Sequence, residues 1–267
     1  MIVGNYVEIE GVKVFPKYIN EKSNDYNSQG LDILFDEEMS YFWFLSRKEF
    51  IFQQMKRYVD FSSNIIEVGA GTGNVSMFLK QKGYLNISVG EMHLNGLKYA
   101  KSYGLDRCYQ FDLLCSPFKN EFDVVCMFDV LEHIYDDNKA LLNSYQMLKP
   151  NGQIILTVPA HKWLWHRGDA IGGHKRRYNK KELSSILNKN GFSIVNARYF
   201  FISIVPLLLL RKLLNYRENE EKSNFHINPI INKILLFISR IENKCNRFLP
   251  NMFGGSLLLI AKKNDTV

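Results

Sequence analysis

Cysteines, leader-like segments and long apolar runs are all scarce in this sequence. Its four cysteines form no CxxC pair and lack the spacing of a metal site, so we expect buried free thiols, a reducing compartment and no metal. The N-terminal stretch lacks a basic region followed by an apolar one, so no signal peptide is predicted and a cytoplasmic protein is expected. The apolar run around Pro206 lasts only about a dozen residues, which is too short to span a bilayer.

Acidic residues are nearly missing from residues 160–217, although the whole chain carries a formal net charge of only +7. Asp169 and Glu182 stand there against twelve Lys and Arg, whereas residues 1–159 hold more acids than bases. Within this segment, "KRRYNKK" spans Lys175–Lys181. Such an uneven charge indicates an anionic partner or surface, and a solvated basic surface is the alternative.

Short apolar runs alternate with amphipathic segments along most of the chain. The runs have the length of strands, and several of the segments between them end at a glycine, as helices do. This alternation predicts a parallel sheet covered on both faces, a doubly wound α/β fold that binds its ligand at the carboxyl ends of the strands. Residues 1–35 suggest an irregular arm, and residues 37–59 have helical spacing. Strands are expected at residues 64–68, 86–91, 108–111, 122–128, 153–159, 193–200 and 254–263.

The stretch "IIEVGAGTGN" joins the first expected strand to the first helix after it. Gly69, Gly71 and Gly73 permit a tight turn with positive φ, and the following helix presents free N–H groups to an anion. Such turns serve many nucleotides and also occur without a ligand. A dinucleotide-binding loop would have its third glycine at position 74, which is Asn74. Glu91 ends the second expected strand, where a carboxylate can accept both hydroxyls of a ribose.

An ordered series of motifs extends from this loop to residue 133. It comprises Glu67, the glycines of "GAGTG", Glu91, the pair Phe111–Asp112, and "FDVLEH" at residues 128–133. Together these motifs resemble those of class I S-adenosylmethionine (SAM)-dependent methyltransferases over residues 60–198. The resemblance implies a methyltransferase with SAM as cofactor and S-adenosylhomocysteine as product. It also implies a Rossmann-like sheet of seven strands in which the last strand is antiparallel.

The same resemblance assigns roles in cofactor binding. The glycine loop would hold the methionine part of SAM, Glu91 the ribose and Asp112 the adenine amine, and the loop after the fourth strand would flank the sulfonium. The residues placed around SAM in this way are Glu67, Gly69, Ala70, Gly71, Gly73, Glu91, Met92, Asp112, Leu113, Phe128, Asp129, Val130 and His133.

The loop after the fifth expected strand lies over the methyl donor in this fold. Its "GGHKRRY" stretch and the "YFWFLSRKEFI" segment resemble a bacterial subgroup linked to cell-surface glycan or lipid-linked sugar biosynthesis. Packing over the sheet is an alternative role for its tryptophans, and an ion pair with Asp169 or Glu182 is an alternative for one of its two adjacent arginines. Asn179 is expected to cap the next helix. The candidate substrate-binding residues are Trp43, Arg47, Trp163, Trp165, Asp169, Arg176, Arg177 and Tyr178.

Methyl transfer to a hydroxyl needs alignment and gains from a general base, for which histidine is suited at neutral pH. His174 ranks first, because it lies between a glycine pair and two arginines. His133 follows the cofactor loop, where ordering that loop is an alternative role, and His161 belongs to the substrate loop. The candidate catalytic residues are therefore His174, His133 and His161.

Residues 199–252 differ again in character. A second apolar run there places Ile230, Ile234, Ile238 and Ile241 on one helical face. We expect two apolar helices inserted before the last strand, as a lid, a dimer face or an interfacial membrane anchor. The predicted organisation is an N-terminal helical cap (1–60), a SAM-binding core (61–198), this insertion (199–252), and the last strand with a tail (253–267).

The sequence thus predicts a SAM-dependent methyltransferase, with O-methylation of an anionic or sugar-containing small molecule or a lipid-linked glycan. One alternative is methylation of a lipid or quinone-like ring at the membrane, and another is a SAM-binding regulatory or assembly protein without activity. No "NPPY"-like tetrapeptide follows the fourth strand, which argues against a nucleic-acid substrate. Peripheral contact with the inner face of the membrane is expected through residues 199–252, and the oligomeric state is left open.

Overall fold

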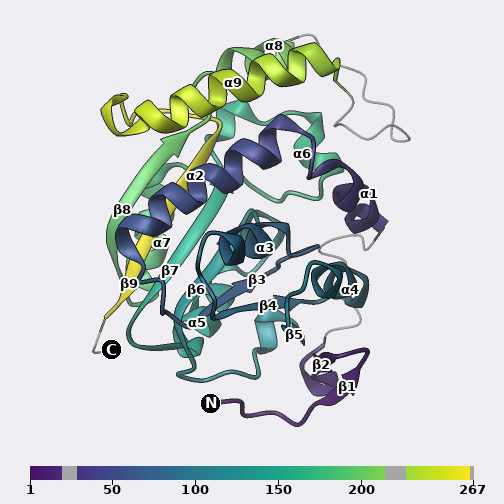
Figure 1. The fold of residues 1–267 in the computed structure, drawn as a ribbon. Coiled ribbons are helices and arrows are strands. Elements are labelled where there is room, and N and C mark those ends of the chain that lie inside the picture. The colour runs from purple at the N-terminus through teal and green to yellow at the C-terminus, as the bar shows by residue number, and fades with distance from the viewer. Residues whose placement is uncertain (20–28, 214–226, 265–267) are drawn as a thin grey trace.

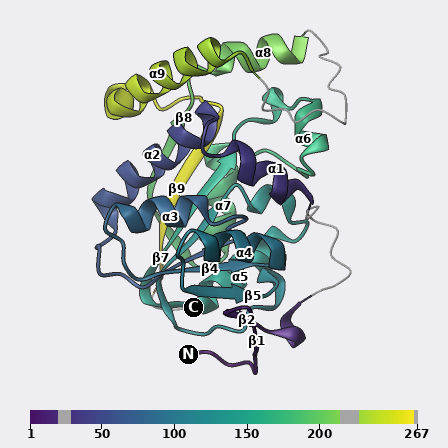
Figure 2. The ribbon, with the colours of Figure 1, turned by 45° about the vertical axis from the view of Figure 1, so that its right-hand side comes forward.

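The computed structural model describes residues 1–19, 29–213 and 227–264, which are built around one large sheet (Figures 1 and 2). The strand order within these residues is β1-β2-β5-β4-β3-β6-β7-β9-β8. Strands β5, β4, β3, β6 and β7 run parallel to one another. The predicted Rossmann-like α/β architecture is therefore confirmed. The strands are β1 (Val7–Ile9), β2 (Val12–Val14), β3 (Ile65–Val68), β4 (Ile87–Glu91), β5 (Arg107–Gln110), β6 (Phe122–Phe128), β7 (Leu148–Pro159), β8 (Phe192–Phe200) and β9 (Ser256–Lys263).

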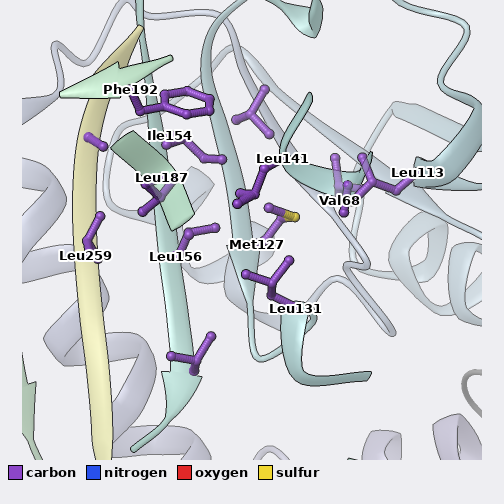
Figure 3. Packing of buried hydrophobic residues seen from close by; sticks show 14 of the residues in the cluster. Val68, Leu113, Met127, Leu131, Leu141, Ile154, Leu156, Leu187, Phe192 and Leu259 are labelled. Carbon is purple, nitrogen blue, oxygen red and sulfur yellow. The ribbon is translucent and has the colours of Figure 1, made fainter. Parts of the chain in front are cut away.

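The parallel strands are apolar on both sides because both sides are covered. Ile66 and Met127 belong to a cluster with side chains of α5 and α7, part of which Figure 3 shows, whereas Ile65 and Cys126 belong to a second cluster with α2 and α3. Successive residues of a strand point to opposite faces, so near-continuous apolar runs fill both clusters.

The helices are α1 (Gln29–Glu37), α2 (Phe42–Tyr58), α3 (Asn74–Gln81), α4 (Leu94–Ser102), α5 (Asp137–Met147), α6 (Arg167–Ile171), α7 (Lys180–Lys189), α8 (Val205–Leu213) and α9 (Pro229–Cys245), with 3-10 turns η1 (Pro16–Tyr18), η2 (Leu113–Cys115), η3 (Leu131–His133), η4 (Lys162–Leu164) and η5 (Asn246–Phe248).

Two N-terminal strands extend the sheet beyond the seven strands that the family resemblance implied. β1 and β2 form an antiparallel hairpin, and β2 then pairs in parallel with β5. Glu10 and Gly11 form the two-residue loop with φ of 50° and 75°, as a tight hairpin requires. The described sheet has nine strands, so the predicted number was wrong, and the arm at residues 1–35 is not irregular throughout. The alternation "VEI", "EG", "VKV" was the signal for this hairpin.

The last strand, β9, lies between β7 and β8 and is antiparallel to both, as expected. Ser256, at its start, lies opposite both Pro159, at the end of β7, and Phe200, at the end of β8. The chain that connects β8 to β9 therefore leaves and re-enters the sheet at the carboxyl ends of the strands. This arrangement places α8 and α9 at the edge where a doubly wound fold binds its ligand.

Helices α8 and α9 lie on the outside of the molecule, beyond α2, at the end opposite the β1–β2 hairpin (Figures 1 and 2). Residues 214–226 of the predicted insertion lie outside the described residues. Among the helices that are described, none combines the length and the apolar character needed to cross a membrane. Whether this region is a lid, a dimer face or an anchor stays a prediction at this point.

Candidate functional site

A cavity of about 990 Å³ opens at the carboxyl ends of the parallel strands. Its walls come from the loops after β3, β4, β5 and β6, together with side chains of α1, α2, α6, α8 and α9. A cavity of this size at this edge is typical of a site for a small-molecule ligand. Among the residues that the sequence placed around SAM, those lining it are Glu67, Gly69, Ala70, Gly71, Glu91, Met92, Asp112, Leu113, Phe128, Asp129, Val130 and His133.

The glycine loop shows why each glycine is needed. Gly69 has φ of 68°, and a Cβ atom there would lie 2.6 Å from Cγ2 of Val130. Gly71 also has positive φ and lines the cavity. Gly73 differs, because it caps α3 and faces away from the cavity, where a Cβ atom would lie 2.8 Å from that of Ala100. Gly73 was a candidate for cofactor contact, but the structure gives it a packing role between α3 and α4.

Glu91 ties the end of β4 to the glycine loop. Its carboxylate accepts hydrogen bonds from the backbone N–H groups of Gly71, at 2.9 Å, and of Met92 and His93, at 2.7 and 3.1 Å. Burial raises the pKa of Glu91, while these N–H groups oppose the rise. A carboxylate offers about four lone-pair positions, so the two oxygens can still accept a hydroxyl. Glu91 and the glycine loop therefore fit a ribose-bearing cofactor such as SAM, and we call this part of the cavity the cofactor end.

Two more carboxylates border the same end of the cavity. Asp112 caps η2 by accepting a hydrogen bond from the N–H of Leu114 at 2.8 Å. Glu67 is buried, accepts a hydrogen bond from Oγ of Ser76, and has its pKa raised to about 7 by burial. Glu67 thus holds a proton at mildly acidic pH and links β3 to α3 beside the glycine loop.

An ion pair crosses the middle of the cavity wall. Arg47, on α2, binds the carboxylate of Asp129, which follows β6 and has φ of 57°. The guanidinium also lies 4.6 Å from the ring centre of Trp43. The predicted substrate residues Trp43 and Arg47 therefore do line the cavity. The charge of Arg47 is already balanced by a residue that the sequence assigned to the cofactor, which leaves less of it for an anionic acceptor.

Asp169 organises the loop after β7 around one buried carboxylate. Its Oδ1 lies 2.8 Å from Nδ1 of His174 and 2.9 Å from Nε of Arg177, and its Oδ2 accepts the N–H of His166. Burial alone would raise the pKa of Asp169, but the hydrogen bond from His174 and the charge of Arg177 lower it to about 2. The expectation that one of the two arginines pairs with Asp169 or Glu182 is met by Arg177.

His133 and His174 meet at the acceptor side of the cavity. Their ring centres lie 4.8 Å apart in an edge-to-face arrangement. Burial, together with the neighbouring His174, lowers the pKa of His133 to about 3, so the ring of His133 is neutral at pH 7. Glu132, next in the chain, is fully buried in the same wall, and burial raises its pKa well above the ordinary value.

Five residues predicted for the acceptor loop do not line this cavity. His161 has φ of 58°, which turns its ring onto Tyr199 at 4.8 Å, and Trp163 stands beside His161 with about half of its surface exposed. For His161 and Trp163, the turn η4 directs the side chains away from the cavity. Arg176 and Tyr178 both bind Oδ2 of Asp137 on α5, and Trp165 directly follows η4. The positions that need this correction are His161, Trp163, Trp165, Arg176 and Tyr178.

The two arginines of the basic stretch are paired with carboxylates within the molecule. Arg176 pairs with Asp137, and Lys175 lies over the ring of Tyr135. Asn179 caps α7 in a reciprocal arrangement with Glu182, which confirms the predicted cap. The ion pair of Arg176 therefore ties this segment to α5, and the cap by Asn179 sets the start of α7.

Several wall residues were not among the candidates. Glu132 lies in the predicted "DVLEH" motif, and its place directly before His133 was the available signal for a special role. Leu207, Leu208 and Leu235 of α8 and α9 also line the cavity, and no sequence pattern indicated which residues of these helices would face it. Others reach the cavity from α1 and from the turn after β4, namely Leu31, Leu34, Glu38 and His93.

Comparison with known proteins places this site in context. The methyltransferase domain family matches residues 35–197, more than half of the chain. A ubiquinone biosynthesis O-methyltransferase of Pseudomonas entomophila is 29% identical over 100 residues, which are 35% of this chain and 43% of that protein. Phosphoethanolamine N-methyltransferase 2 of Caenorhabditis elegans is 27% identical over 190 residues, which are 64% of this chain and 42% of that protein.

Among solved structures, the fold resembles phosphoethanolamine N-methyltransferase 2 of Haemonchus contortus in complex with phosphomonomethylethanolamine and S-adenosylhomocysteine. The TM-score is 0.58 at 16% identity, covering 94% of this chain and 61% of that one. At this identity the likeness concerns the fold. The chain spans less than half the length of the two curated relatives named above.

Proposed function

This chain belongs to the methyltransferase domain family and is a SAM-dependent methyltransferase, and we propose that it methylates a hydroxyl of an acceptor carried on a membrane lipid. Bound SAM supplies an electrophilic methyl group on a positively charged sulfur. The match to a methyltransferase domain favours an active enzyme over a SAM-binding protein without activity. The acceptor is our proposal, and the following features of the chain support it.

The main support for this proposal comes from helix α9, because its polar side chains are buried and its apolar side chains are exposed. Its buried residues are Ser239, Glu242 and Asn243. Glu242 accepts hydrogen bonds from the backbone of Ile202 and Ser203, and Asn243 donates to Ser46. Its apolar side chains face outward, and their exposed fractions reach 69% at Ile230 and 66% at Phe237. The outward set is Ile230, Ile231, Ile234, Phe237, Ile238 and Ile241.

Further exposed apolar residues lie before and after α9 in the chain and extend its outward face. They are Leu207, Leu209, Leu210 and Leu213 on α8, and Phe248, Met252 and Phe253 after α9. We call all these outward side chains the apolar face. Patches of this kind on a soluble domain mark protein or membrane interaction sites. A helix with apolar residues outward and no length to span a bilayer suits the interfacial layer of a membrane.

Charge around the apolar face favours a lipid surface as its occupant. Exposed Lys233, Lys244 and Arg247 accompany it, and the single acid of α9, Glu242, is buried. Cationic side chains at the rim of an apolar face are attracted to anionic lipid headgroups, each contributing about 1 kcal/mol near the surface. A second copy of the chain would bring the same positive charges together, which opposes dimerisation through this face.

The apolar face is continuous with the cavity. Leu207 and Leu210 are exposed and also line the cavity, and Leu235 lines it from α9. A lipid-borne acceptor could therefore enter along these side chains while its tail stays in the membrane. This continuity is the reason for proposing a lipid carrier, because a water-soluble acceptor would need no apolar entrance.

The polar end of the entrance suits a hydroxyl acceptor. Arg47 and Arg177 are both balanced by carboxylates, so they offer little net charge to an anion. His174 is held by Asp169 through Nδ1, which leaves Nε2 to meet the acceptor. The glycan acceptor expected from the bacterial subgroup remains within this proposal if the lipid carries it. The printed names of the relatives, O-methylation in ubiquinone biosynthesis and phosphoethanolamine N-methylation, also support an acceptor of lipid metabolism.

The test combines membrane binding with transfer of labelled methyl groups. The native protein should float with vesicles containing anionic lipid and should label lipid extracts in the presence of methyl-labelled SAM. The double variant Ile234→Ser and Phe237→Ser should lose most of its binding to vesicles and most of its methyl transfer to lipid. The reason is that it removes exposed apolar area without changing the cavity.

The matched control is Leu85→Ser, since Leu85 is 72% exposed but precedes β4 at the opposite edge of the sheet. This control should float as the native protein does. If the native protein stays in solution as a dimer that the double variant splits, the apolar face is a dimer interface. Label found only in water-soluble products would overturn the lipid-borne acceptor.

A further inference from the structure

Three side chains with metal-binding atoms converge on the acceptor side of the cavity. Glu132 and His133 belong to η3, after β6, and His174 lies in the loop before α7. One ligand atom of each lies within 4.8 Å of the other two. The sequence led us to expect no metal, because the search for spacing was based on cysteines and these residues are brought together only by the fold.

Glu132 is the least satisfied member of this group. Its side chain is 0% exposed, and neither carboxylate oxygen has a hydrogen-bond partner among the described residues. The nearby guanidinium of Arg47 is engaged by Asp129 instead. A buried carboxylate without a partner is costly, and a bound cation is one of the few groups that can compensate it. Because Glu132 lines the cavity, a cation could reach it from there.

His174 is oriented as metal-binding histidines are. Its Nδ1 lies 2.8 Å from Oδ1 of Asp169, an oxygen that also accepts a hydrogen bond from Nε of Arg177, and this arrangement suits the tautomer in which Nδ1 carries the hydrogen and donates it. Nε2 is then the free acceptor, and it belongs to a ring held by a buried carboxylate. Metal-bound histidines nearly always donate their other ring hydrogen in this way, which fixes the tautomer and orients the ring.

We propose that Glu132, His133 and His174 bind one divalent transition-metal ion of the zinc class, with at least one coordination position open to the cavity. Two imidazoles and one carboxylate form a ligand set that suits zinc, and three protein ligands are typical of sites that keep a position for water or substrate. The open position would receive the hydroxyl oxygen of the acceptor, so that Nε2 of His174 meets the acceptor through the metal. This role rests on the proposed function. The binding of the metal itself does not depend on the acceptor.

The test measures zinc binding directly. Native protein freed of metals with a chelator should bind one zinc ion per chain in equilibrium dialysis. Glu132→Gln keeps the size of the side chain but removes the charge, and His174→Ala removes a ligand. Each should weaken zinc binding by about 100-fold or more. His93→Ala, at the cofactor end of the same cavity, is the matched control and should bind zinc as the native protein does.

A second measurement uses cobalt(II), whose visible absorption reports its ligands. The native protein should show the band of a low-coordinate site, and Glu132→Gln should not, while SAM binding by both shows that the variants are folded. Zinc affinity that is absent in the native protein, or unchanged in Glu132→Gln and His174→Ala, overturns the metal site. If methyl transfer to lipid persists in that case, the proposed function stands. Zinc bound by the native protein without transfer to lipid would instead count against the proposed function alone.

Discussion

Two buried carboxylates, Glu91 and Glu132, face the same cavity and differ in what surrounds them. Glu91 accepts backbone N–H groups from Gly71, Met92 and His93, all within 20 residues of it in the chain. Glu132 accepts none from the described residues. The carboxylate at the cofactor end is therefore satisfied by local backbone, whereas the carboxylate at the acceptor end is not, which is the reason for the cation proposed there.

The acceptor end brings together two loops that lie far apart in the chain. Asp169 holds His174 and Arg177 from the loop after β7, and η3 supplies His133 from the loop after β6. Because the acceptor end is assembled from separate loops, we expect a single substitution there to displace more residues than a single substitution in the glycine loop. The predictions below use this contrast.

The largest effect is expected from Asp169→Asn. This substitution leaves the buried guanidinium of Arg177 without its counter-charge, and breaking a buried pair in this way costs about 3 to 5 kcal/mol of unfolding free energy. Urea unfolding measures the loss. Glu182→Gln is the matched control, because it breaks the exposed pair with Lys162 and should cost less than about 1 kcal/mol. Equal losses in both variants would contradict the role given to Asp169.

Glu67→Gln tests the cofactor end through pH. The folded pKa of Glu67, about 7, lies above its ordinary value of 4.5, so its contribution to stability is full below pH 4.5 and is lost as the pH rises through 7. The glutamine of Glu67→Gln does not titrate, so the variant does not lose stability over this pH range in the same way. Its stability relative to the native protein should therefore rise by about 3 kcal/mol between pH 4.5 and pH 8. Urea unfolding at several pH values measures the difference, and a difference independent of pH would show that Glu67 is ionised throughout.

Glu91→Ala tests the cofactor end through its affinity for SAM. It leaves three N–H groups of the loop without their acceptor and removes the proposed partner of the ribose, so SAM affinity should fall by about 100-fold in calorimetric titration. Glu121→Ala, at an exposed carboxylate, should leave SAM affinity unchanged. A loss of less than about threefold in Glu91→Ala would remove Glu91 from the cofactor site.

The smallest effects are expected on the two faces of α9. Glu242→Ala leaves the N–H groups of Ile202 and Ser203 unsatisfied and should lower the unfolding free energy by about 2 kcal/mol. Phe237→Ala removes a larger side chain but from the exposed face, so it should change stability by less than about 0.5 kcal/mol. The reverse order in thermal unfolding would mean that the apolar face is buried within the folded monomer.

The cofactor end could be predicted from the sequence because its parts are local. The strand, the glycine loop and Glu91 lie within one β-α-β unit, and the family resemblance assigned the further residues. All of the residues assigned to the cofactor except Gly73 line the cavity. Gly73 was misassigned because a positive φ serves close packing against α4 as well as ligand contact. The nine-stranded sheet was missed because each N-terminal strand has only three residues.

The acceptor end could be predicted only in part. The sequence identified the loop and ranked His174 first, but the direction of each side chain depends on turns such as η4 and on partners elsewhere, such as Asp137 for Arg176. The same limit applies to α9. Its apolar stripe could be recognised in the sequence, but the direction in which the stripe faces could not. Its outward orientation follows from the buried Glu242 and Asn243, whose partners are distant in the chain.

The most direct measurement is SAM titration into His174→Ala, combined with methyl transfer by the same sample to lipid that the native enzyme labels. The two ends of the cavity are separable in our account. SAM affinity should therefore stay within about threefold of native while transfer falls by about 100-fold or more. A variant that loses SAM affinity to the same extent as Glu91→Ala, or that transfers methyl groups at the native rate, would contradict this division of the cavity.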